Sequence, residues 1–99
     1  MLYAIFGSDA PDSLGARGAA RTAHLARVSA LRDQGRLVIA GPHPRLETGE
    51  PGEAGFSGSL IVAEFSSLEE AEAWAQADPY VHAGAWAQVS VKPFIQVMP

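Results

Sequence analysis

The sequence predicts an α+β fold of the ferredoxin-like type, a βαββαβ sandwich with one antiparallel sheet and both helices on one of its faces. Two observations carry this prediction. Four short segments are rich in strand-forming apolar residues, and two segments between them show the spacing of a buried helix face. Their order along the chain is strand, helix, strand, strand, helix, strand. A chain of 99 residues also suits one domain with a modest core.

The first strand is predicted over residues 2–6, an apolar run that ends in turn-forming residues. Asp12 or Ser13 is positioned to cap the helix that follows. Because Gly15 and Gly18 weaken the first turns of this helix, we expect it to have a broken start.

The second strand is predicted over residues 37–40, and the breaker sequence at residues 41–44 is expected to close it. Residues 45–57 are polar and rich in glycine, and a loop of this length is usually functional or mobile. The third strand is predicted over residues 59–65.

The second helix is predicted to begin with a capping box, in which Ser67 is the N-cap and Glu70 the third helical residue. Pro79 ends this helix just before Asp78, which then caps a short turn. Residues 86–97 form the last strand, and a proline within it places the strand at a sheet edge or a bulge.

The first three strands are apolar at consecutive positions, so both faces of the sheet require burial. Two helices can cover only one face. We therefore expect a homodimer in which a second copy covers the other face, the alternative being a monomer with an exposed apolar face.

The composition, 47% hydrophobic and 18% charged with a net charge of −4, excludes several classes of function. No Lys/Arg-rich tract is present, which argues against nucleic-acid binding, although arginines between Arg17 and Arg45 give a local positive region. Cysteine is absent, so disulfides and thiolate metal sites are excluded. Without a signal-peptide pattern or a membrane-length apolar run, we expect a cytoplasmic protein with no membrane contact.

His24 is a candidate catalytic residue. It lies four residues before Val28, beside the buried stripe of the first helix, where its ring nitrogens need hydrogen-bond partners. Those partners are either a backbone carbonyl, in a purely structural role, or a functional group. Asp78 needs no explanation beyond its capping role, yet both helices share one side of the sheet, so it can also approach His24. A carboxylate on one ring nitrogen would make the other a better base.

Other motifs are missing. No HExxH or HxH spacing joins His24, His43 and His82, so no metal site is predicted. The phosphate-binding patterns GxGxxG and GxxxxGK[ST] are absent, and we expect no cofactor. GxSxG is absent as well, which leaves a hydrolase elbow without support.

Five further residues are candidates for binding a small-molecule substrate. Arg21, one helical turn before the histidine, either steers an anionic group or is a solvated helix charge. Ser59 either donates to a substrate oxygen or only begins a strand. Tyr80 either shapes a pocket or packs in the core. The corner formed by Gly41 and Pro42 either shapes the same pocket or is a plain turn. The loop over residues 45–57 is either a lid or simply disordered.

Seven segments carry a family resemblance across the whole chain: RTAHL (21–25), GRL (35–37), AGP (40–42), SLEEA (67–71), DPY (78–80), AG (83–84) and VKPF (91–94). With their spacing, they are similar to the YciI-like (YCII-related) family. The resemblance implies that residues 1–99 are a single YCII-related domain with a dimeric α+β barrel fold related to muconolactone isomerase. It also implies a pocket built on a histidine–aspartate pair, at His24 and Asp78. Family members look like small enzymes, and one branch resembles dehydrochlorinases of chlorinated aromatic rings. Thr22 stands where close relatives often have proline.

Three hypotheses follow. The first is an enzyme in which His24, oriented by Asp78, is a general acid or base toward a small organic substrate, as in a lyase, isomerase or dehydrochlorinase. The second is a non-catalytic ligand-binding or assembly module, in which the same pair only stabilises the fold. In the third, His24 and Asp78 bind a divalent metal.

Overall fold

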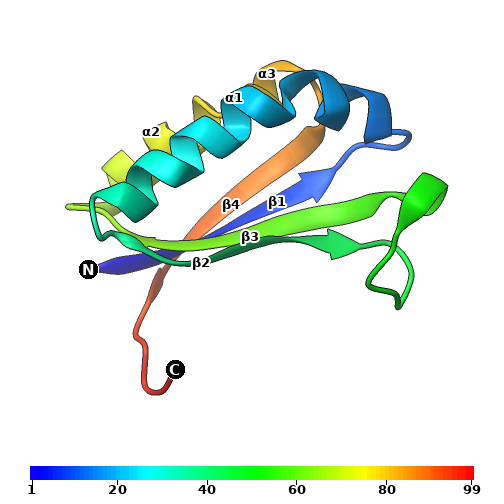
Figure 1. Ribbon diagram of the computed structural model, residues 1–99. Helices are drawn as coiled ribbons and strands as arrows, with labels where there is room; N and C mark the ends of the chain where they lie inside the picture. Colours follow the sequence, from blue (N-terminus) through cyan, green and yellow to red (C-terminus); the bar gives the residue numbers. More distant parts are fainter.

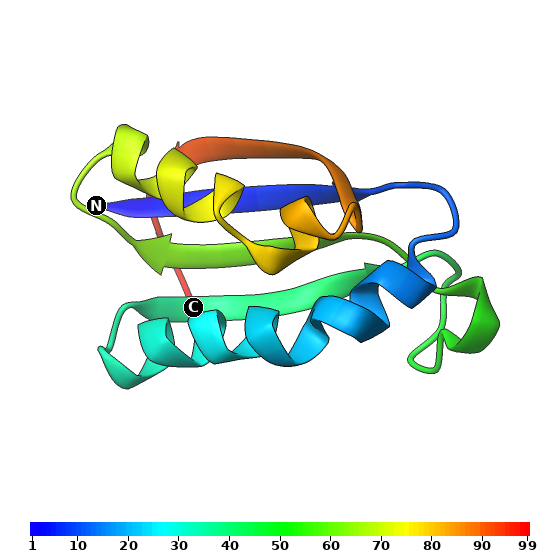
Figure 2. The same ribbon diagram turned by 90° about the horizontal axis from the view of Figure 1, so that it is seen from above.

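The computed structural model describes residues 1–99. Its elements are β1 (Leu2–Asp9), α1 (Leu14–Asp33), β2 (Leu37–Pro44), the 3-10 turn η1 (Gly52–Ala54), β3 (Phe56–Glu64), α2 (Leu68–Gln76), α3 (Pro79–His82) and β4 (Trp86–Phe94). The strands form one antiparallel sheet in the order β2-β3-β1-β4, and the helices lie together on one face of it (Figure 1). Seen from above, α1 runs along the β2 side of the sheet, and α2 and α3 lie toward the β4 side (Figure 2). The predicted ferredoxin-like α+β fold is therefore confirmed.

The core lies between the sheet and the helix layer. Alternate residues of the two central strands supply it from below, with Ile5 of β1 opposite Ile61 of β3, and both side chains are fully buried. Val28 and Leu31 of α1 meet them from above, in the helical spacing that the sequence shows. This single layer of apolar contacts fixes the position of α1 over the sheet.

The start of α1 differs from the prediction, because the helix is continuous from Leu14 and has no break at its glycines. Ser13 does not cap the helix with its side chain, and its hydroxyl donates instead to Asp9 at the end of β1. Arg17 of the first turn binds the same carboxylate. These tertiary contacts stabilise the first turn and outweigh the low helix propensity of glycine.

The second strand also differs from the prediction, because it runs through the breaker sequence to Pro44. It is an edge strand that pairs with β3 alone, and edge strands tolerate prolines. Pro42 therefore pairs with Ser59 inside the ladder. Ser59 itself lies within β3, which begins three residues before it.

The predicted caps of the two later helices are confirmed. Ser67 accepts a hydrogen bond from the Glu70 amide at 3.1 Å, while the Glu70 carboxylate completes the turn by accepting from Ser66. Asp78 caps α3 by accepting from the Tyr80 amide at 2.9 Å.

The outermost strand β4 contains Pro93, as predicted for an edge strand, but it ends at Phe94. Residues 95–99 leave the sheet and extend away from its helix-free side (Figure 1).

The helix-free side of the sheet is not covered within one chain. Its apolar residues include Phe6 and Ile39, which are 36% and 58% exposed. No helix has the length and apolar character needed to cross a bilayer.

Candidate active site

A cavity of about 510 Å³ lies between the first half of α1, the edge of the sheet formed by β2 and β3, and α3. Its walls are mostly apolar, and no carboxylate is among the residues that line it. The polar and charged lining residues are Arg17, Arg21, His24, Ser59 and Tyr80, and the others are Leu14, Gly18, Leu25, Val28, Ala40, Gly41, Pro42, Phe56, Leu60 and Ile61. The five residues predicted to bind substrate are thus all at this cavity. Its volume suits a small organic ligand.

His24 and Asp78 meet in a buried hydrogen bond. The histidine Nδ1 lies 2.9 Å from both carboxylate oxygens, and the side chains are 9% and 0% exposed. Since an ionised carboxylate only accepts hydrogen bonds, Nδ1 carries the proton and donates it. When the ring is neutral, Nε2 is left as a proton acceptor, and the ring lines the cavity. Asp78 lies behind the ring, outside the cavity wall.

Asp78 has two further partners. It accepts the α3 capping bond from Tyr80, and Arg27 of α1 places Nη1 3.4 Å from its Oδ2. Arg27 also donates from Nη2 to the carbonyl of Trp74 at 2.9 Å. The two interpretations of Asp78 left open by the sequence are therefore compatible, because one carboxylate both caps a helix and holds the histidine.

Two aromatic rings pack against the His24 side chain of the pair. The Tyr80 ring stacks on His24 with centroids 4.0 Å apart, and Trp86 of β4 meets both rings at a steep angle. Burial raises the pKa of Tyr80 above its ordinary value of 10.0, although the charges of Arg17 and Arg21 act in the opposite direction. The Tyr80 hydroxyl is thus protonated at neutral pH and is available as a hydrogen-bond donor.

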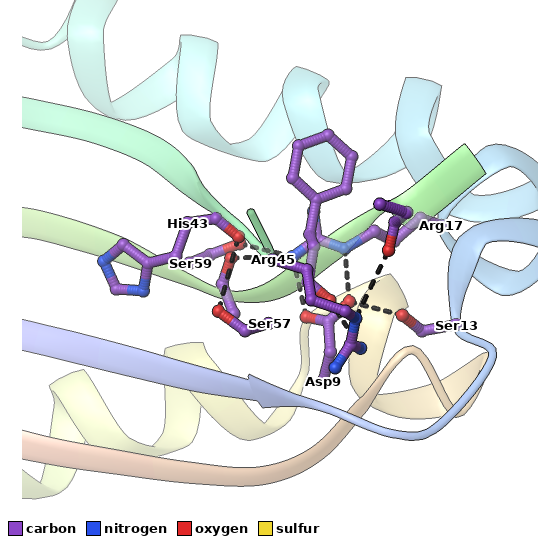
Figure 3. Close-up of polar contacts among 10 residues, drawn as sticks. Asp9, Ser13, Arg17, His43, Arg45, Ser57 and Ser59 are labelled. Atoms are coloured by element: carbon purple, nitrogen blue, oxygen red, sulfur yellow. Dashed lines mark hydrogen bonds and ion pairs between the residues drawn. The ribbon is translucent and has the colours of Figure 1, made fainter. Parts of the chain in front are cut away.

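Arg17 is a site residue that sequence reasoning missed. Its guanidinium binds Asp9 through two bonds, Nε to Oδ2 at 2.6 Å and Nη2 to Oδ1 at 2.7 Å, and both side chains are buried. Nη2 also donates to Ser59 Oγ at 2.9 Å, as Figure 3 shows. Because Ser59 accepts this bond, its own proton is free for another acceptor. The signal for this cluster was the spacing of Asp9, Ser13 and Arg17, four residues apart across the end of a strand and the start of a helix.

Arg21 differs from Arg17 because it has no carboxylate within ion-pair distance. It is exposed and lies at the cavity, where its charge is not neutralised by the chain. The lining of the cavity therefore carries a positive charge and no negative one.

The other histidines, His43 and His82, are exposed and do not line the cavity. Figure 3 shows the His43 ring directed away from Arg17. No group of three or more histidine or acidic side chains is arranged to hold a metal ion. At the base of the predicted loop, Arg45 donates to the carbonyls of Ala54 and Phe56.

The fold and the site together define a class: a small ferredoxin-like α+β domain with a buried His–Asp pair beside a cationic cavity. Comparison with known proteins gives the family. The model of the YCII-related domain matches residues 1–95. The protein YciI of Escherichia coli O6:H1 is 57% identical over 97 residues, covering 98% of this chain and 99% of that protein. An uncharacterized protein of Haemophilus influenzae is 48% identical over the same length and coverage. The chain belongs to the YCII-related family.

A solved structure extends the comparison to a ligand complex. The 5-chloro-2-hydroxyhydroquinone dehydrochlorinase of Burkholderia phenoliruptrix AC1100, in complex with 2,5-dihydroxybenzoquinone, superposes with a TM-score of 0.82. The two chains are 29% identical, and the match covers 96% of this chain and 94% of that one.

Proposed function

We propose that this protein is a small enzyme in which His24 is a general acid or base toward a small anionic or aromatic substrate, with Asp78 as the residue that orients it. The observation that carries the proposal is that the imidazole ring has a buried carboxylate on one side and a cavity on the other. Nδ1 is held by a buried carboxylate, while the ring itself lines a cavity of ligand size. A base that is fixed in one tautomer beside a binding cavity is suited to proton transfer.

The cavity supports this choice of substrate. Arg21 supplies an unpaired positive charge, and the Ser59 and Tyr80 hydroxyls can donate to substrate oxygens. The apolar walls suit a flat ring, and the similar dehydrochlorinase is named for a substrate of this kind. Proton transfer at carbon or oxygen is common to isomerisation, elimination and dehydrochlorination, so we propose a reaction of this class, with no cofactor or metal.

The test has two stages. Chlorinated hydroquinones, lactones and small unsaturated acids are first screened for an increase in melting temperature, and compounds that raise it are then assayed for turnover. We expect His24→Gln to lower kcat by at least about a hundredfold while binding is retained. His82→Gln, a histidine outside the cavity, is the matched control. Unchanged turnover in His24→Gln would sink the proposal.

The alternative is a non-catalytic ligand-binding or assembly module. It is favoured by one observation, the capping bond that Asp78 accepts from the Tyr80 amide of α3, which gives the carboxylate a structural role of its own. In that case a ligand still binds the cavity, but no compound of the screen is converted by the parent, and His24→Gln shows only a loss of stability.

We also propose that the protein is a homodimer, joined through the helix-free face of the sheet. The apolar side chains that support this proposal are Leu2, Phe6, Ile39, Leu60 and Phe94, all of which alternate with residues of the helix-covered face. A patch of this kind on a chain of 10.4 kDa is typical of an oligomer interface. The cytoplasmic location and the absence of nucleic-acid binding stay predictions from sequence.

A further inference from the structure

Arg27 is the second cation on the buried carboxylate of the site. It follows His24 by three residues on α1, so both side chains reach the Asp78 carboxylate from one face of the helix. Nη1 lies 3.4 Å from Asp78 Oδ2, and Nη2 donates to the Trp74 carbonyl at 2.9 Å. The guanidinium carbon lies 4.3 Å from the centre of the Trp74 ring, which fixes the side chain in place.

We infer that Arg27 is a positioning residue that keeps His24 in its neutral, proton-accepting form by neutralising Asp78. The inference deepens the proposed function and rests on His24 being the base. Its physical content is a charge balance among three groups. Arginine stays protonated in proteins, so the pair of Arg27 and Asp78 has no net charge while the imidazole is neutral.

Protonation of His24 would add one positive charge to this balanced group. The carboxylate is fully buried and the imidazole nearly so, and an uncompensated charge in such a place is costly. Without Arg27, the charge balance favours the protonated imidazole instead of the neutral one. A protonated His24 and an ionised Asp78 would then form the neutral pair, and Nε2 would be occupied by a proton instead of being available to a substrate.

The remaining charged and titratable groups around His24 do not replace Arg27. On α1, Arg17 is neutralised by Asp9, and Arg21 opens toward the cavity. From α3, Tyr80 is neutral. From β4, the packed side chain is Trp86, which does not titrate. Arg27 is thus the cation that shares the Asp78 carboxylate with the imidazole.

The experiment is a titration of the histidine ring followed by NMR, with no substrate present. His24→Gln assigns the signal, and the exposed His43 and His82 are internal references in every spectrum. We expect Arg27→Gln to move the midpoint of the His24 titration upward by about one pH unit. Arg27→Lys retains the charge and should leave the midpoint within about 0.3 pH unit of the parent. Arg32→Gln removes an exposed charge from the same helix and should leave it unchanged.

A midpoint that stays in place or falls in Arg27→Gln overturns the inference. So does an equal rise in Arg27→Lys, which would assign the effect to packing on Trp74, or in Arg32→Gln, which would assign it to net charge. If Arg27→Gln does not fold, Arg27→Met, which keeps the aliphatic stem over Trp74, gives the same comparison. Because no substrate is used, failure of the enzyme assay and failure of this inference are separate results.

Discussion

The ring of Tyr80 lies flat against the ring of His24, with the two planes 10° apart, and Trp86 closes the stack by meeting both rings at 78° to 81°. The three rings come from α3, α1 and β4, so the cavity wall depends on the docking of α1 against two elements that lie far along the chain from it. The base and the aromatic wall of the cavity are therefore one packed unit.

The first prediction concerns the pH dependence of stability. Because burial raises the pKa of Tyr80, the folded chain retains the phenolic proton at a pH where the unfolded chain has lost it. The folded state then binds more protons, so the free energy of unfolding falls as the pH rises. This contribution is fully present below pH 10.0, the ordinary pKa of tyrosine, and is lost as the pH rises through the folded-state pKa.

Tyr80→Phe removes this titration. Urea denaturation of both proteins at about pH 8 and about pH 11 should show a steeper loss of stability in the parent than in the variant. Parallel losses would mean that the Tyr80 hydroxyl is as well solvated in the folded chain as in the unfolded one.

The second prediction concerns Gly7. A Cβ at this position would lie 2.3 Å from Trp86 Cε2, so the indole must move if any side chain is added. We expect Gly7→Ala to lower the free energy of unfolding by about 2–3 kcal/mol and to change the tryptophan fluorescence. Gly15→Ala, in a helix with open space around the added methyl group, should instead raise stability by about 0.5–1 kcal/mol. If Gly7→Ala also raises the free energy of unfolding, the Trp86 indole moves aside without cost and the prediction is wrong.

Periodicity and turn chemistry were enough to predict the order of elements and the caps of the later helices. They left the pairing of His24 with Asp78 open, and only the family resemblance implied it. They failed where a contact with a distant residue decides the local structure. The glycines of the first helix predict a broken start, but Arg17 holds that turn to the end of the first strand. Pro42 predicts the end of a strand, but an edge strand tolerates it.

The same limit explains why the role of Arg17 was missed. Its partner lies on another element, and a charged residue on a helix is most often solvated. Arg27 was missed for the same reason, because its two acceptors lie about fifty residues further along the chain. Spacing within one element cannot reveal partners that only the packing of α1 beside α2 and α3 brings together.

The third prediction concerns the pair of Arg17 and Asp9. Arg17→Met leaves the Asp9 carboxylate buried without a counterion, so we expect a loss of about 3–5 kcal/mol in the free energy of unfolding. Adding Asp9→Asn to this variant removes the uncompensated charge and should restore part of the loss. Urea denaturation of the single and double variants measures both the loss of stability and its partial recovery. Additive losses would contradict a direct charge coupling.

The fourth prediction tests the proposed dimer. Phe6, 36% exposed on the helix-free face, is replaced by lysine, and sedimentation equilibrium is compared with that of the parent. We expect the parent at twice the mass of one chain and Phe6→Lys shifted toward the monomer, because a charge in an apolar interface is costly. Leu68→Lys, at a residue 38% exposed on α2, is the matched control and should stay dimeric. A monomeric parent would refute the dimer outright.

The fifth prediction separates a catalytic from a structural histidine–aspartate pair by comparing its two members. Asp78 accepts hydrogen bonds from three groups, while the His24 ring has Asp78 as its one polar partner in the chain. Asp78→Ala removes a helix cap and leaves Arg27 unpaired, so a loss of about 3–5 kcal/mol in the free energy of unfolding is expected. His24→Gln leaves the carboxylate with Arg27 and the Tyr80 amide, and its cost should stay near about 1–2 kcal/mol. The asymmetry matters because an enzyme can then lose its base without losing its fold. If His24→Gln is as destabilising as Asp78→Ala, the imidazole is a structural part of the core and the binding-module alternative gains support.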